Sequence, residues 1–198
     1  MDYLIIAILF AALGFYTFKL FGKQRPKKPV LDIELVPFSM HGCNVRSRIS
    51  SEQWKKVCTV THKKAKNGYR CQICNQSGKT QGFPHPVEVH EIWCHDQASF
   101  TQKLEGLVSL CPLCHRVKHL GLADKQGYGE IARQHMRRVN RMSVDQVAQH
   151  IQQATVVVKE RSQVNWNLDL TYLNRPEFNF LMTEFHEHEN SNCQKLNF

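Results

Sequence analysis

Two pairs of cysteines with the same short spacing are the clearest chemical feature of this sequence. Cys71 and Cys74 form one pair, Cys111 and Cys114 form the other, and two residues separate the members of each pair. Two thiolates on one tight turn can bind the same tetrahedral ion, so two such turns supply the four sulfur ligands of a closed zinc site. In a reducing compartment this use of cysteine is favoured over disulfide bonds. The sequence therefore predicts a structural Zn²⁺ bound by all four thiolates.

Three histidines close to these cysteines have the spacing for a second ion. In VEVHEIW, residues 87–93, apolar and polar residues alternate, which predicts a strand that carries His90. His115 and His119 are four residues apart in a helix that is expected to begin near Pro112, so they share one helical face. A strand and a helix that meet here would give three nitrogen ligands and an open position, as a hydrolytic metal ion needs to hold a phosphate. We therefore expect a catalytic divalent cation at these three histidines.

These motifs resemble the HNH endonucleases, which have a ββα-metal, treble-clef core. The resemblance covers Tyr69 to Ala123, with CQICNQSG as the first zinc knuckle, VEVHEIW as the histidine-bearing strand and LCPLCHRVKH as the metal-binding helix. A weaker similarity, to a group of bacterial HNH proteins, continues to about Leu173. The resemblance implies an endonuclease that hydrolyses DNA phosphodiester bonds with a structural Zn²⁺ and a catalytic Mg²⁺, Mn²⁺, Ni²⁺ or Zn²⁺.

The resemblance also assigns roles to single residues, and the sequence departs from the family at two of them. His90, His115 and His119 match the metal ligands. Glu91 stands where most active members have the general-base histidine, and Gly106 stands where they have the asparagine. A carboxylate can act as a base if burial raises its pKa toward neutrality. We therefore predict Glu91 as the catalytic base, with His90 and His115 as further catalytic residues.

The chain is basic, and the excess charge is concentrated in one segment. The 26 Lys and Arg residues exceed the 17 Asp and Glu residues, 26 − 17 = +9, which favours an anionic partner such as nucleic acid or lipid headgroups. Residues 46–70 hold eight basic residues and one acidic residue, 8 − 1 = +7, on a helical pattern from Ser51. A solvated basic face beside anionic lipid is the alternative to DNA contacts. The predicted contacts to DNA are Lys55, Lys56, Lys63, Lys64, Lys66, Arg70, Arg137 and Arg138.

The amino-terminal residues suggest attachment to a membrane. Residues 3–18 carry no charge, and the apolar stretch continues to residue 22. About 20 helical residues cross a hydrocarbon core of about 30 Å. Basic residues follow this stretch at once, which predicts that the rest of the chain is cytoplasmic. We therefore expect a single-pass membrane protein that contacts the bilayer through residues 3–22.

The remaining sequence predicts the elements around the two ion sites. Residues 31–36 alternate like a short strand within a proline-containing linker. A helix is predicted over 128–140, and Ser143 to Gln146 is a capping-box pattern that begins another helix reaching about residue 160. We predict five segments: a transmembrane anchor (1–22), a linker (23–45), an HNH-like zinc and nuclease domain with its basic helix (46–125), a helical extension (126–172) and a flexible tail (173–198).

The composition completes these predictions, since 42% hydrophobic residues in 198 indicate a folded, globular chain. The predicted fold class is α+β, a small ββα-metal, treble-clef zinc core with flanking α-helices and an N-terminal transmembrane helix. The predicted function is a membrane-anchored HNH endonuclease. The alternatives are a membrane-tethered, zinc-stabilised nucleic-acid-binding protein that does not cut, and a membrane-bound interaction domain. His85 and His95 are the alternatives to Glu91 as the base.

Overall fold

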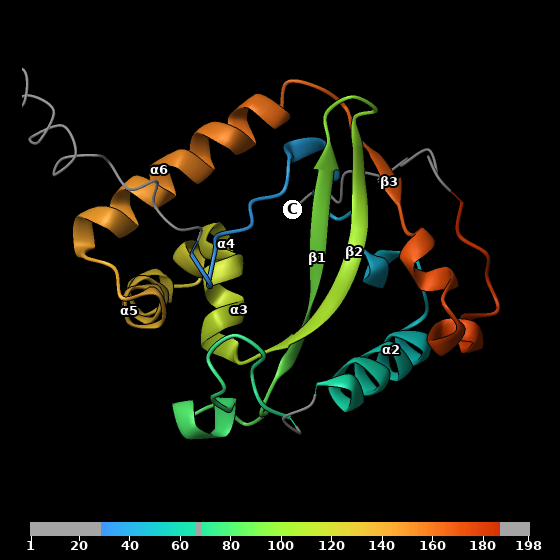
Figure 1. The fold of residues 1–198 in the computed structure, drawn as a ribbon, viewed down its shortest axis with the longest axis horizontal. Helices are drawn as coiled ribbons and strands as arrows, with labels where there is room; N and C mark the ends of the chain where they lie inside the picture. The colour runs from blue at the N-terminus through green and yellow to red at the C-terminus, as the bar shows by residue number, and fades with distance from the viewer. Residues whose placement is uncertain (1–28, 66–68, 187–198) are drawn as a thin grey trace, which may run out of the picture.

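The computed structural model describes residues 29–65 and 69–186, which form a small sheet with helices on both sides (Figure 1). The sheet contains β1 (Glu88–Asp96), β2 (Thr101–Leu110) and β3 (Asn167–Asp169). The α-helices are α2 (Ser51–Lys64), α3 (Pro112–Lys118), α4 (Leu120–Lys125), α5 (Gly129–Asn140) and α6 (Val144–Arg161). Short 3-10 helices are η1 (Phe38–Met40), η2 (Val45–Ser47), η3 (Gly78–Gln81), η4 (Thr171–Asn174) and η5 (Pro176–Leu181).

The long hairpin of β1 and β2 is the centre of the fold. The two strands are antiparallel, and their register shifts between Ile92 and Trp93. Such a shift bends the strand and releases backbone groups from the ladder. The hairpin and the helix α3 that follows it lie where the sequence predicts them. β3 was not predicted, and it pairs parallel with the start of β2 over three residues.

Side-chain caps fix the beginnings of the two longest helices. Ser143 accepts a hydrogen bond from the N–H of Gln146, whose side chain accepts in return from the N–H of Ser143. The predicted capping box of α6 is therefore confirmed. α2 begins with the same reciprocal arrangement between Ser50 and Gln53. These bonds satisfy N–H groups that the first helical turn would otherwise leave without an acceptor.

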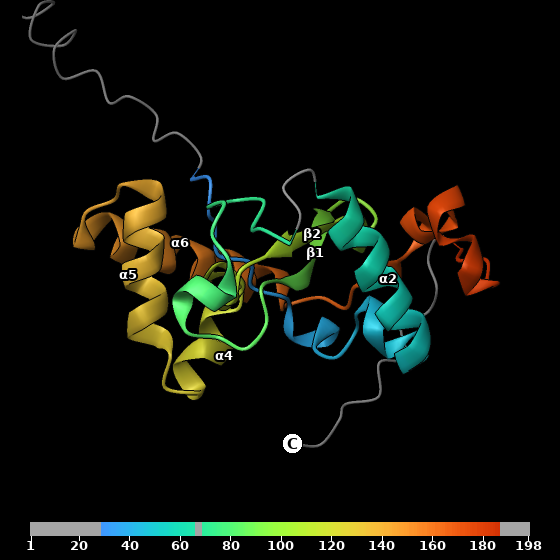
Figure 2. The same cartoon turned by 90° about the horizontal axis from the view of Figure 1, so that it is seen from below.

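Two apolar cores lie on either side of the hairpin. One core joins α3, α4, α5 and α6 to the zinc knuckles, and the other joins α2 and η2 to the chain after α6. Figures 1 and 2 show these two groups of helices at opposite ends of the molecule. Leu31 and Ile33 are buried in the first core, although they belong to the stretch that the sequence assigns to a linker. Residues 31–36 do not form the expected strand.

The predicted fold class needs one correction. The described part of the chain is α+β with a small three-stranded sheet, but it contains no helix long and apolar enough to span a bilayer. The helix predicted over 1–22, and with it the membrane contact through 3–22, falls outside the described residues. The described residues therefore form an α+β fold in which none of the helices is a transmembrane helix.

Candidate metal centres

Two turns bring the four cysteines together. In the first turn, the N–H of Asn75 donates to the carbonyl of Cys71, and Asn75 has a φ of 58°. The N–H of Gln72 donates to the carbonyl of Ser109, which fixes this turn to the end of β2. The second turn is the beginning of α3, where Cys111 is the N-cap. The hairpin therefore ends directly beside both pairs of thiols.

The sulfur atoms have the spacing of a tetrahedral zinc site. All four sulfur atoms lie within 4.8 Å of one another, and Cys74 Sγ lies 3.5 Å from Cys111 Sγ. A zinc ion with Zn–S bonds of about 2.3 Å requires sulfur atoms about 3.8 Å apart. Cys71, Cys111 and Cys114 are buried, as a closed structural site requires. This cluster can hold a metal ion such as zinc.

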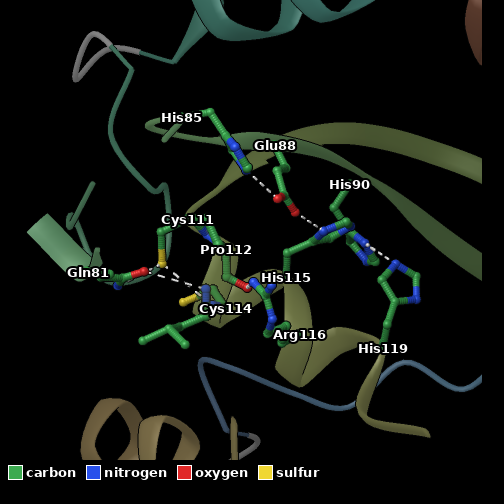
Figure 3. Close-up of polar contacts among 11 residues, drawn as sticks. Gln81, His85, Glu88, His90, Cys111, Pro112, Cys114, His115, Arg116 and His119 are labelled. Carbon is green, nitrogen blue, oxygen red and sulfur yellow. Dashed lines mark hydrogen bonds and ion pairs between the residues drawn. The ribbon is translucent and has the colours of Figure 1, made fainter. Parts of the chain in front are cut away.

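Two polar side chains support the thiolates from outside the cluster. Gln81 Nε2 donates to Cys111 Sγ over 3.2 Å, and His135 Nε2 lies 3.1 Å from Cys114 Sγ (Figure 3 shows Gln81 and both thiols). His135 is buried at 2% exposure. Such outer partners orient metal ligands and stabilise their charge. Neither Gln81 nor His135 was predicted from the sequence, because neither residue belongs to a ligand motif.

The three predicted histidines converge on one point. His90 projects from near the start of β1, His115 from α3, and His119 from the junction of α3 and α4. One nitrogen from each ring lies within 4.8 Å of the others, and His90 Nδ1 is 3.2 Å from His119 Nε2 (Figure 3). These three histidines form one group of side chains that could hold an ion among the described residues. Three imidazoles with a free fourth position are the ligand arrangement of a catalytic rather than a structural ion.

Burial keeps His119 and His90 in the form that binds metal. Together with the charges of the nearby His115 and His90 rings, burial lowers the pKa of His119 to about 3. Burial also lowers the pKa of His90, against the opposing effect of Glu34. A neutral imidazole offers a lone pair to an ion, so at neutral pH these two rings need not lose a proton first.

A pocket opens beside the histidines and contains an arginine held between two aromatic rings. The Arg116 guanidinium lies 4.5 Å from the ring centroid of Phe83 and 4.3 Å from that of Tyr128. Its Nε atom is buried and has no hydrogen-bond partner among the described residues. A planar, pre-oriented guanidinium is well suited to bind phosphate. The pocket is lined by Glu88, His115, Arg116, His119, Leu122, Ala123 and Gln126.

Two carboxylates that the sequence analysis missed contact the histidine cluster. Glu88 joins His115 to His85 through its two oxygens (Figure 3). Burial raises the pKa of Glu88, but the hydrogen bonds and charges of His115 and His85 together outweigh burial and bring it to about 2. Glu34 Oε2 lies 2.9 Å from His90 Nε2. The alternation of β1 could have indicated Glu88, which is two residues from His90 and therefore on the same face.

The predicted base, Glu91, lies on the opposite face of β1 from His90. Adjacent strand residues point to opposite sides, and Glu91 Oε1 accepts a hydrogen bond of 2.8 Å from the N–H of Val45. Burial raises its pKa to about 7, although hydrogen bonds from the N–H groups of Val45 and Arg46 lower it. Glu91 is not among the residues that line the pocket. Glu91 therefore has a pKa that suits a base at neutral pH, but it does not contact the three histidines.

Other residues of the predicted site lie apart from this centre. Gly106 pairs with Ile92 at the register shift of the hairpin. His95 Nε2 contacts Gln102, and burial lowers the pKa of His95 to about 4, aided by the charge of Arg161. His85 is exposed, and its described contact with the cluster runs through Glu88.

The predicted DNA-contacting residues form two separate groups. Lys55, Lys56, Lys63 and Lys64 are exposed on α2, and Arg70 is exposed beside the first knuckle, whereas Arg137 and Arg138 are exposed on α5. Lys56 and Lys64 form salt bridges with Glu52 and Glu177. α2 and α5 lie at opposite ends of the molecule (Figures 1 and 2), so the structure does not bring the two groups together. Lys66 falls outside the described residues.

Comparison with family models, with curated proteins and with solved structures finds no match in any of the three. The two clusters are therefore interpreted from their own geometry and chemistry.

Proposed function

We propose that this chain is a metal-dependent endonuclease of the HNH type that hydrolyses phosphodiester bonds of DNA. The observation that supports the proposal most directly is the convergence of His90, His115 and His119 beside a pocket. A purely structural ion would be expected to have four protein ligands, as the cysteine cluster provides. Hydrolysis needs an open coordination position where the ion can hold the scissile phosphate, and Arg116 lies in the same pocket, where it could bind a phosphate.

Each part of the site has a distinct task in this proposal. The three histidines hold a divalent cation, Mg²⁺, Mn²⁺, Ni²⁺ or Zn²⁺, which when bound supplies positive charge to the scissile phosphate and the leaving oxygen. Arg116 binds the same or a neighbouring phosphate, held in place by its two rings. The basic residues of α2 and α5 bind the DNA backbone without reading sequence. The cysteine cluster joins the start of α3 to the end of β2, and so sets the distance between His115 and His90.

Two side chains are candidates to accept the proton of the attacking water. Glu91 has a pKa of about 7, which suits a base at neutral pH. His85 is the alternative because Glu88 contacts both it and His115. A carboxylate on one imidazole nitrogen fixes the ring so that the other nitrogen can accept a proton. Substitution of each residue separates the two assignments.

A second candidate function is a zinc-stabilised protein that binds nucleic acid without cutting it. The position of Glu91 on the far face of β1 favours this alternative, because the residue that replaces the usual base does not contact the histidines. In that case the α2 and α5 residues would still give a DNA affinity that falls with salt.

Plasmid nicking by the full-length protein tests the proposal, with Mg²⁺, Mn²⁺, Ni²⁺ and Zn²⁺ supplied in turn. We expect nicking by the wild type and its loss in His90→Ala and His115→Ala, with DNA binding retained in both variants. Lys159→Ala, on the exposed face of α6 and outside the predicted DNA contacts, is the matched surface control. Salt-sensitive binding with no nicking in any metal would reject the enzyme and support the non-cutting alternative, and nicking that survives both histidine substitutions would also reject the proposed centre.

A further inference from the structure

Glu34 lies in an extended segment that is held between the end of α3 and the shifted register of β1. Its N–H donates to the carbonyl of Lys118 over 3.0 Å. Its Oε1 accepts a hydrogen bond of 3.0 Å from the N–H of Trp93, directly after the register shift between Ile92 and Trp93. The shift thus presents a strand N–H to a side chain from another part of the molecule. Both the backbone and the carboxylate of Glu34 are fixed beside the histidine cluster.

The second oxygen of this carboxylate contacts a predicted metal ligand. Glu34 Oε2 lies 2.9 Å from His90 Nε2 and 3.3 Å from Lys118 Nζ. The side chain of His90 is 2% exposed and that of Glu34 is 16% exposed, so little water competes for these bonds. Oε2 faces the ammonium group of Lys118, and Oε1 accepts from the N–H of Trp93, so both oxygens of this carboxylate act as hydrogen-bond acceptors.

We propose that Glu34 is a positioning residue of the histidine centre, which holds the proton of His90 on Nε2 and presents Nδ1 to the metal ion. A neutral imidazole has one N–H and one lone pair, so a hydrogen bond donated from Nε2 leaves the lone pair on Nδ1. Nδ1 is the nitrogen that faces His119 Nε2 at 3.2 Å. This inference rests on the ion site of the proposed function, but it does not depend on DNA cleavage.

The proposal also accounts for Lys118. Its ammonium group contacts the same oxygen of Glu34 as His90 does, and its side chain is 15% exposed. A buried carboxylate is costly unless hydrogen bonds and opposite charge compensate it. Lys118 supplies that charge when no cation is bound. The carboxylate of Glu34 in turn lowers the cost of bringing a divalent cation close to Lys118.

Metal binding and histidine tautomers test this role independently of cleavage. Co²⁺ is titrated into the full-length protein with Zn²⁺ already bound to the cysteines, and binding is followed by calorimetry and visible absorption. We expect Glu34→Gln to weaken Co²⁺ binding 10- to 100-fold, which is the usual effect of losing an outer partner of a metal ligand. Glu105→Gln, which removes an exposed carboxylate from β2, changes the net charge equally and should alter the affinity less than twofold. Glu34→Asp, which keeps the charge on a shorter side chain, should restore part of the lost affinity.

Nitrogen NMR of the wild type, with Zn²⁺ on the cysteines and no ion added at the histidines, gives a readout that does not require any variant to fold. We expect His90 as the Nε2–H tautomer, and the Nδ1–H tautomer in the wild type would overturn the proposal. An unchanged Co²⁺ affinity in a folded Glu34→Gln would overturn it as well. Co²⁺ binding that depends on Glu34 without any nicking would reject the nuclease and leave this inference standing. Nicking together with a Co²⁺ affinity that does not change in Glu34→Gln would support the nuclease and reject this inference.

Discussion

Gly78 lies directly against Pro112, so that a Cβ atom added to Gly78 would lie 2.7 Å from Pro112 Cδ. The same atom would also overlap the carbonyl oxygen of His85. Gly78 begins η3, whose last residue, Gln81, donates to Cys111 Sγ. Pro112 is the first residue of α3. The absence of a side chain at Gly78 thus lets the loop after the first knuckle pack on the helix that carries the second.

We expect Gly78→Ala to destabilise the zinc-loaded protein by about 2 kcal/mol or more, because added atoms in a filled space force the surroundings to move. One of the overlapping atoms belongs to the backbone, which cannot turn aside as a flexible side chain can. Gly121→Ala is the control, since no atom lies within 4 Å of its added Cβ, and alanine favours the helix by up to about 1 kcal/mol. Urea unfolding of both variants measures the difference. Equal stability of the two variants would show that the loop at Gly78 is not packed as described.

Removal of zinc should unfold the core around the knuckles. The cysteine cluster joins a loop, the end of a strand and the start of a helix, so the free energy of metal binding contributes directly to folding. We expect about one tightly bound Zn²⁺ per chain, retained in a variant with His90, His115 and His119 all replaced by alanine. Chelation or Cys71→Ser should abolish cooperative melting, measured by circular dichroism with metal analysis of the same samples. Unchanged melting after complete removal of zinc would contradict this.

Residues with local spacing rules were predictable from the sequence, and those fixed by distant contacts were not. The cysteine pairs, the His115 and His119 pair and the capping box at Ser143 depend on neighbours within a few residues, and the structure places them as predicted. Glu34 is 56 positions away from its partner His90, and its segment alternates as a strand would. β3 has only three residues and no pattern that marks a strand.

The position of Glu91 also shows which features follow from local spacing and which depend on distant contacts. Strand alternation already separates it from His90, but only the fold shows that η2 provides the N–H of Val45 on that side. Burial is the main cause of the raised pKa of this carboxylate, and no cationic side chain of the described residues forms a salt bridge with it. The family resemblance predicts a base at this position, whereas the tertiary contacts place its carboxylate against Val45 and raise its pKa.

Arg116→Lys should reduce nicking at least tenfold while the cysteine zinc stays bound. Lysine keeps the positive charge but loses the planar group that stacks between Phe83 and Tyr128 and pairs with two phosphate oxygens at once. The lost stacking should lower the free energy of unfolding by about 1 kcal/mol. Arg137→Lys, on the exposed face of α5, should change neither quantity. Single-turnover nicking and thermal melting measure both effects, and an unchanged nicking rate in Arg116→Lys would remove this arginine from the proposed site.

Glu91→Gln should change how the stability of the protein depends on pH. The pKa of Glu91 is about 7 in the folded protein against an ordinary value of 4.5, so between these values the folded state holds a proton that the unfolded state has lost. Stability contributed by this proton is present below about pH 4.5 and is lost as the pH rises through 7. The shift corresponds to at most about 3 kcal/mol.

Glutamine is neutral at every pH and can still accept the hydrogen bond from Val45, so the variant should avoid this loss. We expect Glu91→Gln to be more stable than wild type at pH 8 by up to about 3 kcal/mol, with a smaller difference at pH 5. Urea unfolding at both pH values with saturating Zn²⁺ measures this, and the pH dependence of zinc binding cancels because it is common to both proteins. Glu105→Gln should show the same pH dependence of stability as the wild type.

If Glu91 is also the base, the nicking rate of the wild type should rise through about pH 7, and that rise should disappear in Glu91→Gln. If the nicking rate of Glu91→Gln depends on pH as that of the wild type does, Glu91 is not the base and His85 becomes the candidate.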